Sequence, residues 1–182
     1  MSEESTGNAG EAPGSGAAQG QQGQITLERL YLKDASFENP RSPAVFGEAW
    51  RPEFHLDVNT RTTALGDERF EVVLSVTLRA RAEGDKTAYI AEVQQAGVFR
   101  VVGVDNATRH RVLGTLCPGT LFPYVRECVD SLVVRGGFPP VHLAPVNFDA
   151  LYVEALRKQA AQAQQSGPEP GGEPGGATPP TH

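Results

Sequence analysis

The stretch FEVVLSVTLRARA, residues 70–82, decides the fold class because its apolar and polar side chains alternate. Every even position from Phe70 to Ala82 is apolar, whereas the odd positions are polar or charged apart from Val73. In a strand, successive side chains point to opposite faces of the sheet. The stretch therefore predicts a strand with one face in the core and the other in water.

Three further stretches show a weaker alternation, at residues 25–38, 54–61 and 87–102. The tetrapeptide Glu83–Lys86 is rich in turn residues and predicts a hairpin between 70–82 and 87–102, with a bulge or strand end near Gly97. We therefore expect four antiparallel strands that follow one another along the chain.

After Asn106 the apolar spacing becomes helical. Residues 121–135 predict a helix with Pro123 in its first turn and Gly136-Gly137 as its stop signal. Asn147 predicts the cap of a second helix at 148–165. A run of strands followed by a run of helices favours an α+β fold, a four-stranded antiparallel sheet with two helices packed on one face.

The two ends of the chain differ from its centre in composition. Residues 1–23 contain six glycines and residues 166–182 contain five glycines and five prolines, with few large apolar side chains in either. Such segments cannot bury enough apolar surface to offset the entropy of ordering. We expect disordered tails at 1–23 and 166–182 around one folded domain at 24–165.

Charge and hydropathy exclude several classes of protein. Five of the 22 acidic residues lie in the predicted tails, which leaves 17 acidic against 16 basic residues in the domain, scattered over every element. This balance argues against a nucleic-acid partner. No apolar run approaches membrane-spanning length and the N-terminus lacks the features of a signal peptide, so we expect a cytoplasmic protein without membrane insertion.

No catalytic constellation is visible in the sequence. The four histidines lie in separate regions, and there is no phosphate-binding glycine loop, nucleophile elbow or paired-cysteine zinc spacing. Cys128 falls on the apolar stripe of its predicted helix, as a packed thiol would. We expect no enzymatic activity, no cofactor and no metal site.

The loop RGGFPPVHLAPV, residues 135–146, is unusually apolar for a segment between two helices. Two hypotheses remain open on pattern alone. Phe138 and Leu143 could staple the loop to the core, or the loop could line an exposed apolar groove, which would mark a binding surface.

Strand parity also gathers carboxylates. The even positions of 25–38 place Asp34 and Glu38 on one face, and the same argument places Ile90 beside Glu92 on 87–95. If these strands are neighbours, carboxylates surround one apolar side chain. Such a patch is either a solvated sheet face or a docking site for a basic partner.

Six motifs resemble the bacterial protein-export chaperone family SecB, in order, over nearly all of residues 24–157. They are YLKDASFENP (31–40), VFGEAWRPE (45–53), FEVVLSVT (70–77), AEVQQAGVF (91–99), LFPYVRECV (121–129) and FPPVHLAPVNFDALY (138–152). The resemblance implies dimers formed through sheet edges and a homotetramer, a dimer of dimers, joined through the long first helix. The oligomer interface that it implies consists of Leu121, Val125, Cys128, Val129 and Leu132.

The resemblance also implies a function. It predicts an ATP-independent chaperone that holds unfolded secretory precursors in apolar grooves and delivers them to the export motor SecA. The SecA-binding residues that it implies are Asp34, Glu38, Ile90 and Glu92, the cluster already found by parity, and any zinc would belong to SecA. The client-groove residues that we expect are Phe138, Val141, Leu143, Phe46, Trp50, Phe54 and Leu56.

Two other functions compete with this one. The chain could be a dedicated chaperone of a single unstable partner such as an antitoxin. It could instead bind a small ligand in a closed pocket with the apolar loop as its lid, although such pockets usually show convergent polar groups.

Overall fold

The computed structural model describes residues 23–82 and 86–165, in which the strands come first and the helices follow. The strands are β1 (Gln24–Glu38), β2 (Glu53–Gly66), β3 (Arg69–Ala82) and β4 (Lys86–Val102). The helices are α1 (Asn106–Gly114), α2 (Leu116–Arg135) and α3 (Phe148–Gln165), with a short 3-10 helix η1 (Ala44–Gly47) between β1 and β2. The predicted α+β order is confirmed. The predicted tails at 1–23 and 166–182, apart from Gly23, and residues 83–85 of the predicted turn lie outside the described residues.

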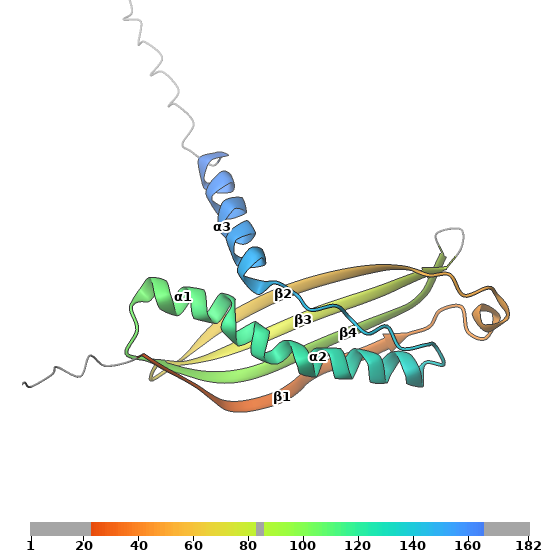
Figure 1. Cartoon of the computed structure of the whole chain (residues 1–182), viewed down its shortest axis with the longest axis horizontal. Helices are drawn as coiled ribbons and strands as arrows, with labels where there is room; N and C mark the ends of the chain where they lie inside the picture. Colours follow the sequence, from red (N-terminus) through yellow and green to blue (C-terminus); the bar gives the residue numbers. More distant parts are fainter. Residues whose placement is uncertain (1–22, 83–85, 166–182) are drawn as a thin grey trace, which may run out of the picture.

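The strands form one antiparallel sheet in the order β1-β4-β3-β2. Consecutive strands β2, β3 and β4 form a meander, and β1 lies on the free side of β4. The chain between Glu38 and Glu53 therefore carries the polypeptide from one edge of the sheet to the other, and it runs past the strand ends through η1 (Figure 1). In the part of the chain that the structure describes, the edge strands β1 and β2 each have a neighbouring strand on one side only.

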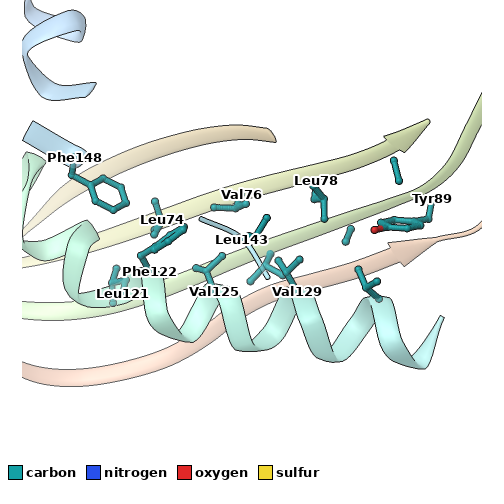
Figure 2. Packing of buried hydrophobic residues seen from close by; sticks show 14 of the residues in the cluster. Leu74, Val76, Leu78, Tyr89, Leu121, Phe122, Val125, Val129, Leu143 and Phe148 are labelled. Atoms are coloured by element: carbon teal, nitrogen blue, oxygen red, sulfur yellow. The ribbon is translucent and has the colours of Figure 1, made fainter. Parts of the chain in front are cut away.

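The inner face of the sheet carries the core that β3 predicts. Val72, Leu74, Val76 and Leu78 are all fully buried, and α2 packs across them and across β4. Figure 2 shows the apolar side chains of α2 pointing at this row. The alternation that decided the fold class thus corresponds to a real inner and outer face.

The outer face of the sheet contains one buried pair that the alternation does not predict. Val73 on β3 and Ala96 on β4 are fully buried there, directly opposite each other in the β3–β4 ladder. Tyr31 on β1 reaches across β4 to donate a hydrogen bond to Glu71 on β3, and Lys33 Nζ lies 2.7 Å from Glu71 Oε1. This bridge between β1 and β3 spans the short side chain of Ala96 and explains why apolar atoms are buried on the outer face.

The glycine at position 97 makes room for the helix and does not mark a bulge. Strand β4 continues through it, and the register of the β3–β4 hairpin shifts instead between Ala80 and Arg81, so the predicted bulge near Gly97 is wrong. A Cβ on Gly97 would lie 2.8 Å from Phe99 and 3.1 Å from Leu121 of α2. The missing side chain, and not the backbone freedom of glycine, is what the fold uses here.

Helix α2 begins at Leu116, five positions before the predicted start at residue 121. Pro118 occupies the first turn, where the N–H that proline lacks would have no helical partner. Pro123 therefore lies inside the helix, and the expectation that it marks the first turn is wrong.

The ends of the helices follow the predicted signals. Gly137 has a φ of +87°, and the N–H of Phe138 donates to the carbonyl of Val133 at 3.2 Å, which is a Schellman motif. Asn147 caps α3, because its Oδ1 accepts the N–H of Ala150 at 3.0 Å. The predicted stop and cap are confirmed.

The position of α3 refines the expected packing. Helix α2 covers the sheet, whereas α3 stands away from it and contacts mainly α1 and the start of α2 (Figure 1). Its anchors are Phe148, packed edge-on against Phe122 with ring centroids 5.8 Å apart, and an ion pair of 3.1 Å between Asp149 and Arg111. Among the described residues, no helix is long and apolar enough to span a membrane.

Candidate functional site

Five aromatic rings meet at one end of the inner face, and we name them the aromatic cluster. Its members are Phe37, Phe46, Trp50, Tyr89 and Phe138. The ring centroid of Phe138 lies 4.7 Å from that of Tyr89 and 4.9 Å from that of Trp50. The cluster thus joins β1, the β1–β2 connection, β4 and the segment after α2.

The segment between α2 and α3, residues 136–147, is held to the body by two buried side chains. Phe138 is 6% exposed and Leu143 is 5% exposed, so both belong to the core of the single chain. Of the two hypotheses for this loop, this burial favours the staple for Phe138 and Leu143, and it counts against their prediction as open groove residues in the single chain. The Schellman motif at the end of α2 turns Phe138 inward. Val141 is half-buried and keeps part of its surface accessible.

A polar contact holds the middle of the same loop. Oδ1 of Asp130, on α2, accepts the backbone N–H groups of Val141 and His142, each at 3.1 Å. His142 has a φ of +51°, a conformation that turns its N–H toward the same carboxylate as that of Val141. Its Nδ1 also lies 3.4 Å from Asp130 Oδ2. The sequence pattern did not reveal Asp130, because a polar residue within a helix gives no sign of the loop that it binds.

Of the remaining predicted groove residues, Phe46 and Trp50 belong to the aromatic cluster and Phe54 and Leu56 lie on β2, and all four are more accessible than Phe138 and Leu143. Phe46 is 51% exposed and Phe54 is 48% exposed, while Trp50 and Leu56 are half-buried. Phe54 and Leu56 pair with Ala80 and Leu78, which places them on the inner face of edge strand β2. An accessible aromatic surface therefore extends from η1 to the free edge of the sheet.

Three of the five predicted oligomer-interface residues are buried within the single chain, which counts against them as contacts to a second copy. Leu121, Val125 and Val129 are 0% exposed in the single chain because they pack on the sheet of the same chain. Cys128 and Leu132 are half-buried and remain candidates. Helical spacing identified the stripe, but spacing does not say whether a stripe faces the chain's own sheet or a second copy. The accessible apolar residues of α2, which the pattern missed, are Leu116, Tyr124 and Val134.

The outer face brings the four predicted acidic-patch residues together. β1 is the neighbour of β4, Glu38 is opposite Ile90, and Ser36 is opposite Glu92. Asp34, Glu38 and Glu92 are exposed, and Ile90 is half-buried among them. We name Asp34, Glu38, Ile90 and Glu92 the acidic patch; it lies on the opposite face of the sheet from α2 and the aromatic cluster.

Two β3 residues extend the acidic patch, and strand parity could have found them. Thr77 Oγ1 donates to Glu92 Oε1 at 3.4 Å. Arg79 is opposite Ile90 on the side away from Glu38, so the apolar side chain has a carboxylate on one side and a guanidinium on the other. The patch is therefore acidic toward β1 and basic toward β3.

The two thiols behave as packed side chains. Burial raises the pKa of Cys117 to about 12, and burial, with a contribution from the negative charge of Glu127, raises that of Cys128. A thiol with a raised pKa is mostly protonated near neutral pH and is a poor nucleophile. Both cysteines are free.

A cleft of about 900 Å³ lies between α3, α1 and the β2 edge. Its lining combines apolar residues such as Leu113 and Leu151 with charged residues such as Arg109 and Lys158. The described residues that line it include none from 136–147, so the apolar loop does not act as its lid. This geometry does not favour the hypothesis of a small ligand enclosed under that loop.

Comparison with known proteins identifies the family. The family model described as preprotein translocase subunit SecB matches residues 18–159. The chain belongs to the SecB family. A protein-export protein SecB from Marinomonas is 49% identical over 78% of this chain and 89% of its own length. One from Xylella fastidiosa is 53% identical over 84% of this chain and 87% of its own length.

A solved structure shares the SecB fold with this chain. The SecB-like chaperone of Mycobacterium tuberculosis, solved in complex with a peptide from an antitoxin, has a TM-score of 0.56 and 19% identity. The match covers 68% of this chain and 91% of that one. The predicted family, fold class and protein-export chaperone function are confirmed, and SecB is a family of chaperones.

Proposed function

We propose that this chain acts in the cytoplasm, without ATP, as a chaperone that binds non-native secretory precursors and delivers them to SecA. The observation that carries the client-binding part is the accessible aromatic surface formed by Phe46 of the aromatic cluster and Phe54 of β2. Apolar surface buried by a client contributes roughly 25 cal/mol per Å². Because a folded protein hides such segments, affinity for this surface tracks unfoldedness.

The edge strand β2 supports a second kind of client contact. Among the described strands it pairs with β3 alone, so we expect its outer backbone groups to be available to an extended polypeptide. Backbone hydrogen bonds are independent of side-chain sequence, and the neighbouring aromatic side chains accept many apolar residues. Together these contacts suit a site that binds many precursors.

SecA docking is assigned to the acidic patch. Exposed carboxylates at Asp34, Glu38 and Glu92 surround Ile90 and attract a basic segment, while Ile90 offers an apolar contact. The sheet separates this patch from the aromatic surface. A client and SecA can therefore bind at the same time, as delivery requires.

Assembly into a homotetramer, a dimer of dimers, would complete the client site. Strand β1 is a long edge strand that no second strand of the described residues pairs with on its outer side, and proteins usually cover or pair such edges. Cys128, Leu132 and the accessible apolar residues of α2 are available to a second copy. Several subunits that hold one client strengthen weak contacts through effective concentration.

The test is binding of a slow-folding secretory precursor in unfolded and folded form, with the mass of the chaperone followed by light scattering. The double variant Phe46→Ser and Phe54→Ser should keep its mass and lose affinity for the unfolded form. Leu65→Ser is the matched control, because Leu65 is equally accessible but lies at the far end of β2. Equal binding by both variants would refute the assignment of this surface, and capture of a single partner would favour a dedicated chaperone.

A further inference from the structure

Tyr89 carries a polar group for which the fold provides no partner. The residue is fully buried at the centre of the aromatic cluster, and its hydroxyl has no hydrogen-bond partner among the described residues. A buried hydroxyl without a partner costs free energy, and such groups in native proteins often mark a site that is completed by something else.

The surroundings of Tyr89 keep this hydroxyl protonated. Burial, helped by the negative charge of Asp130, raises the pKa of Tyr89 above its usual value. The group is therefore available as a hydrogen-bond donor at any physiological pH. Figure 2 shows the hydroxyl oxygen pointing inward, toward the middle of the packed core.

The α2–α3 loop occupies the space beside Tyr89. Phe138 covers the tyrosine ring, with centroids 4.7 Å apart, and Asp130 binds the loop backbone through the N–H groups of Val141 and His142. In this arrangement Asp130 binds main-chain donors, while the nearby hydroxyl finds no main-chain acceptor. The loop thus supplies hydrogen-bond partners for the Asp130 carboxylate but none for the Tyr89 hydroxyl.

We propose that the Tyr89 hydroxyl is a main-chain binding group of the client site, which donates to a backbone carbonyl of an extended non-native chain when residues 139–146 move off Asp130. The inference rests on the proposed chaperone function. A client strand in that position could supply N–H groups to Asp130 as the loop does, and it would add the acceptor that Tyr89 lacks. Its side chains would contact the rings of the aromatic cluster.

Such a site has a clear advantage over a purely apolar one. Burying an extended polypeptide against rings alone would strip its carbonyl groups of water without replacement. A donor in the aromatic cluster removes that penalty at one position, whatever the client sequence. The group acts on the main chain and so preserves the breadth of recognition.

The experiment compares Tyr89→Phe with wild type, using Tyr152→Phe as the control because Tyr152 lies on α3 and packs on Gly114 of α1, outside the aromatic cluster. The probes are reduced, carboxymethylated α-lactalbumin and reduced, carboxymethylated ribonuclease A, two unrelated chains that cannot refold. Affinity and the midpoint of thermal unfolding are both measured. Tyr89→Phe should bind both probes about 3- to 10-fold more weakly, the worth of one hydrogen bond.

Stability provides the second readout. Removing a hydroxyl without a partner should leave the unfolding midpoint of Tyr89→Phe unchanged or raise it. A lowered midpoint would mean that the hydroxyl already has a partner in the resting protein, and unchanged affinity would mean that it does not contact the client; either result overturns the inference. Loss of affinity for one probe alone would indicate a side-chain contact and would also overturn it. If the wild type binds neither probe, the proposed function fails as well.

Discussion

The two faces of the sheet differ in how well the alternation of residues along a strand predicts which side chains are accessible. On the outer face, the acidic patch is made by four residues that lie on the paired strands β1 and β4, and no helix or strand of residues 23–82 and 86–165 covers them. On the inner face, α2 and the α2–α3 loop cover most of the apolar residues, and only some remain accessible. Parity is therefore enough to place an outer-face site, whereas an inner-face site depends on what packs over it.

The largest expected effect tests the boundary between core and groove. Phe138→Ala should lower the free energy of unfolding by about 3–5 kcal/mol, because it removes a buried ring from the aromatic cluster. Phe46→Ala, which changes a ring that is 51% exposed, should cost much less. Chemical denaturation measures both. A small cost for Phe138→Ala would show that the loop is not a core staple.

The second prediction concerns the outer face. The triple variant Asp34→Asn, Glu38→Gln and Glu92→Gln should weaken binding of SecA by about 10-fold or more, because it removes the charges around Ile90 without changing shape. Calorimetry at two salt concentrations measures the effect, which should shrink as salt rises. The matched control neutralises three exposed carboxylates elsewhere, at Glu28, Glu53 and Glu68. An equal loss in the control would mean that net charge, and not the patch, attracts SecA.

The third prediction returns to the inner face and concerns Asp130. Asp130→Ala removes the acceptor of two loop N–H groups and should cost about 1–3 kcal/mol. Amide hydrogen exchange at Val141 and His142 should become faster, while exchange in β3 should change only with global stability. Asp149→Ala, which breaks an exposed ion pair on α3, is the comparison. Unchanged exchange at both amides would show that Phe138 and Leu143 alone hold the loop.

The smallest expected effect concerns the bridge across the outer face. Hydrogen bonds from Lys33 and from Tyr31 hold the pKa of Glu71 below its usual value of 4.5. A carboxyl whose pKa is lowered on folding stabilises the protein above its unfolded pKa, and this contribution is lost as the pH falls through the folded pKa. Tyr31→Phe should therefore lose less than about 1 kcal/mol at neutral pH, with the difference from wild type shrinking below about pH 4.5. A difference that persists at acid pH would mean that the Tyr31 hydroxyl stabilises the fold by something other than its hydrogen bond to the ionised Glu71 carboxylate.

Several features could be predicted from the sequence because they depend on local geometry. The alternation of 70–82 depends on the two-residue period of a strand, and the helix ends at Gly137 and Asn147 depend on backbone conformation and on one side-chain oxygen. Predicting the acidic patch required, besides strand parity, the condition that β1 and β4 are neighbours, which the sheet order fulfils. The observed register places Glu38 opposite Ile90, which agrees with the parity argument that the four residues share one face of the sheet.

Other features depend on contacts between segments far apart in the sequence. An apolar helical stripe looks the same whether it faces the chain's own sheet, as Leu121 and Val125 do, or a second subunit. The burial of Phe138 and the role of Asp130 follow from where the loop returns to α2, which has no signature in local spacing.

Short-range periodicity and backbone preference were enough to predict the four strand regions, the two long helices, the end of α2, the cap of α3 and the side chains that share a strand face. Only the tertiary structure decided the strand order, the start of α2, and which apolar residues are core and which are accessible. The physical reason is that burial depends on every element that packs over a residue, and packing partners are chosen by the whole chain.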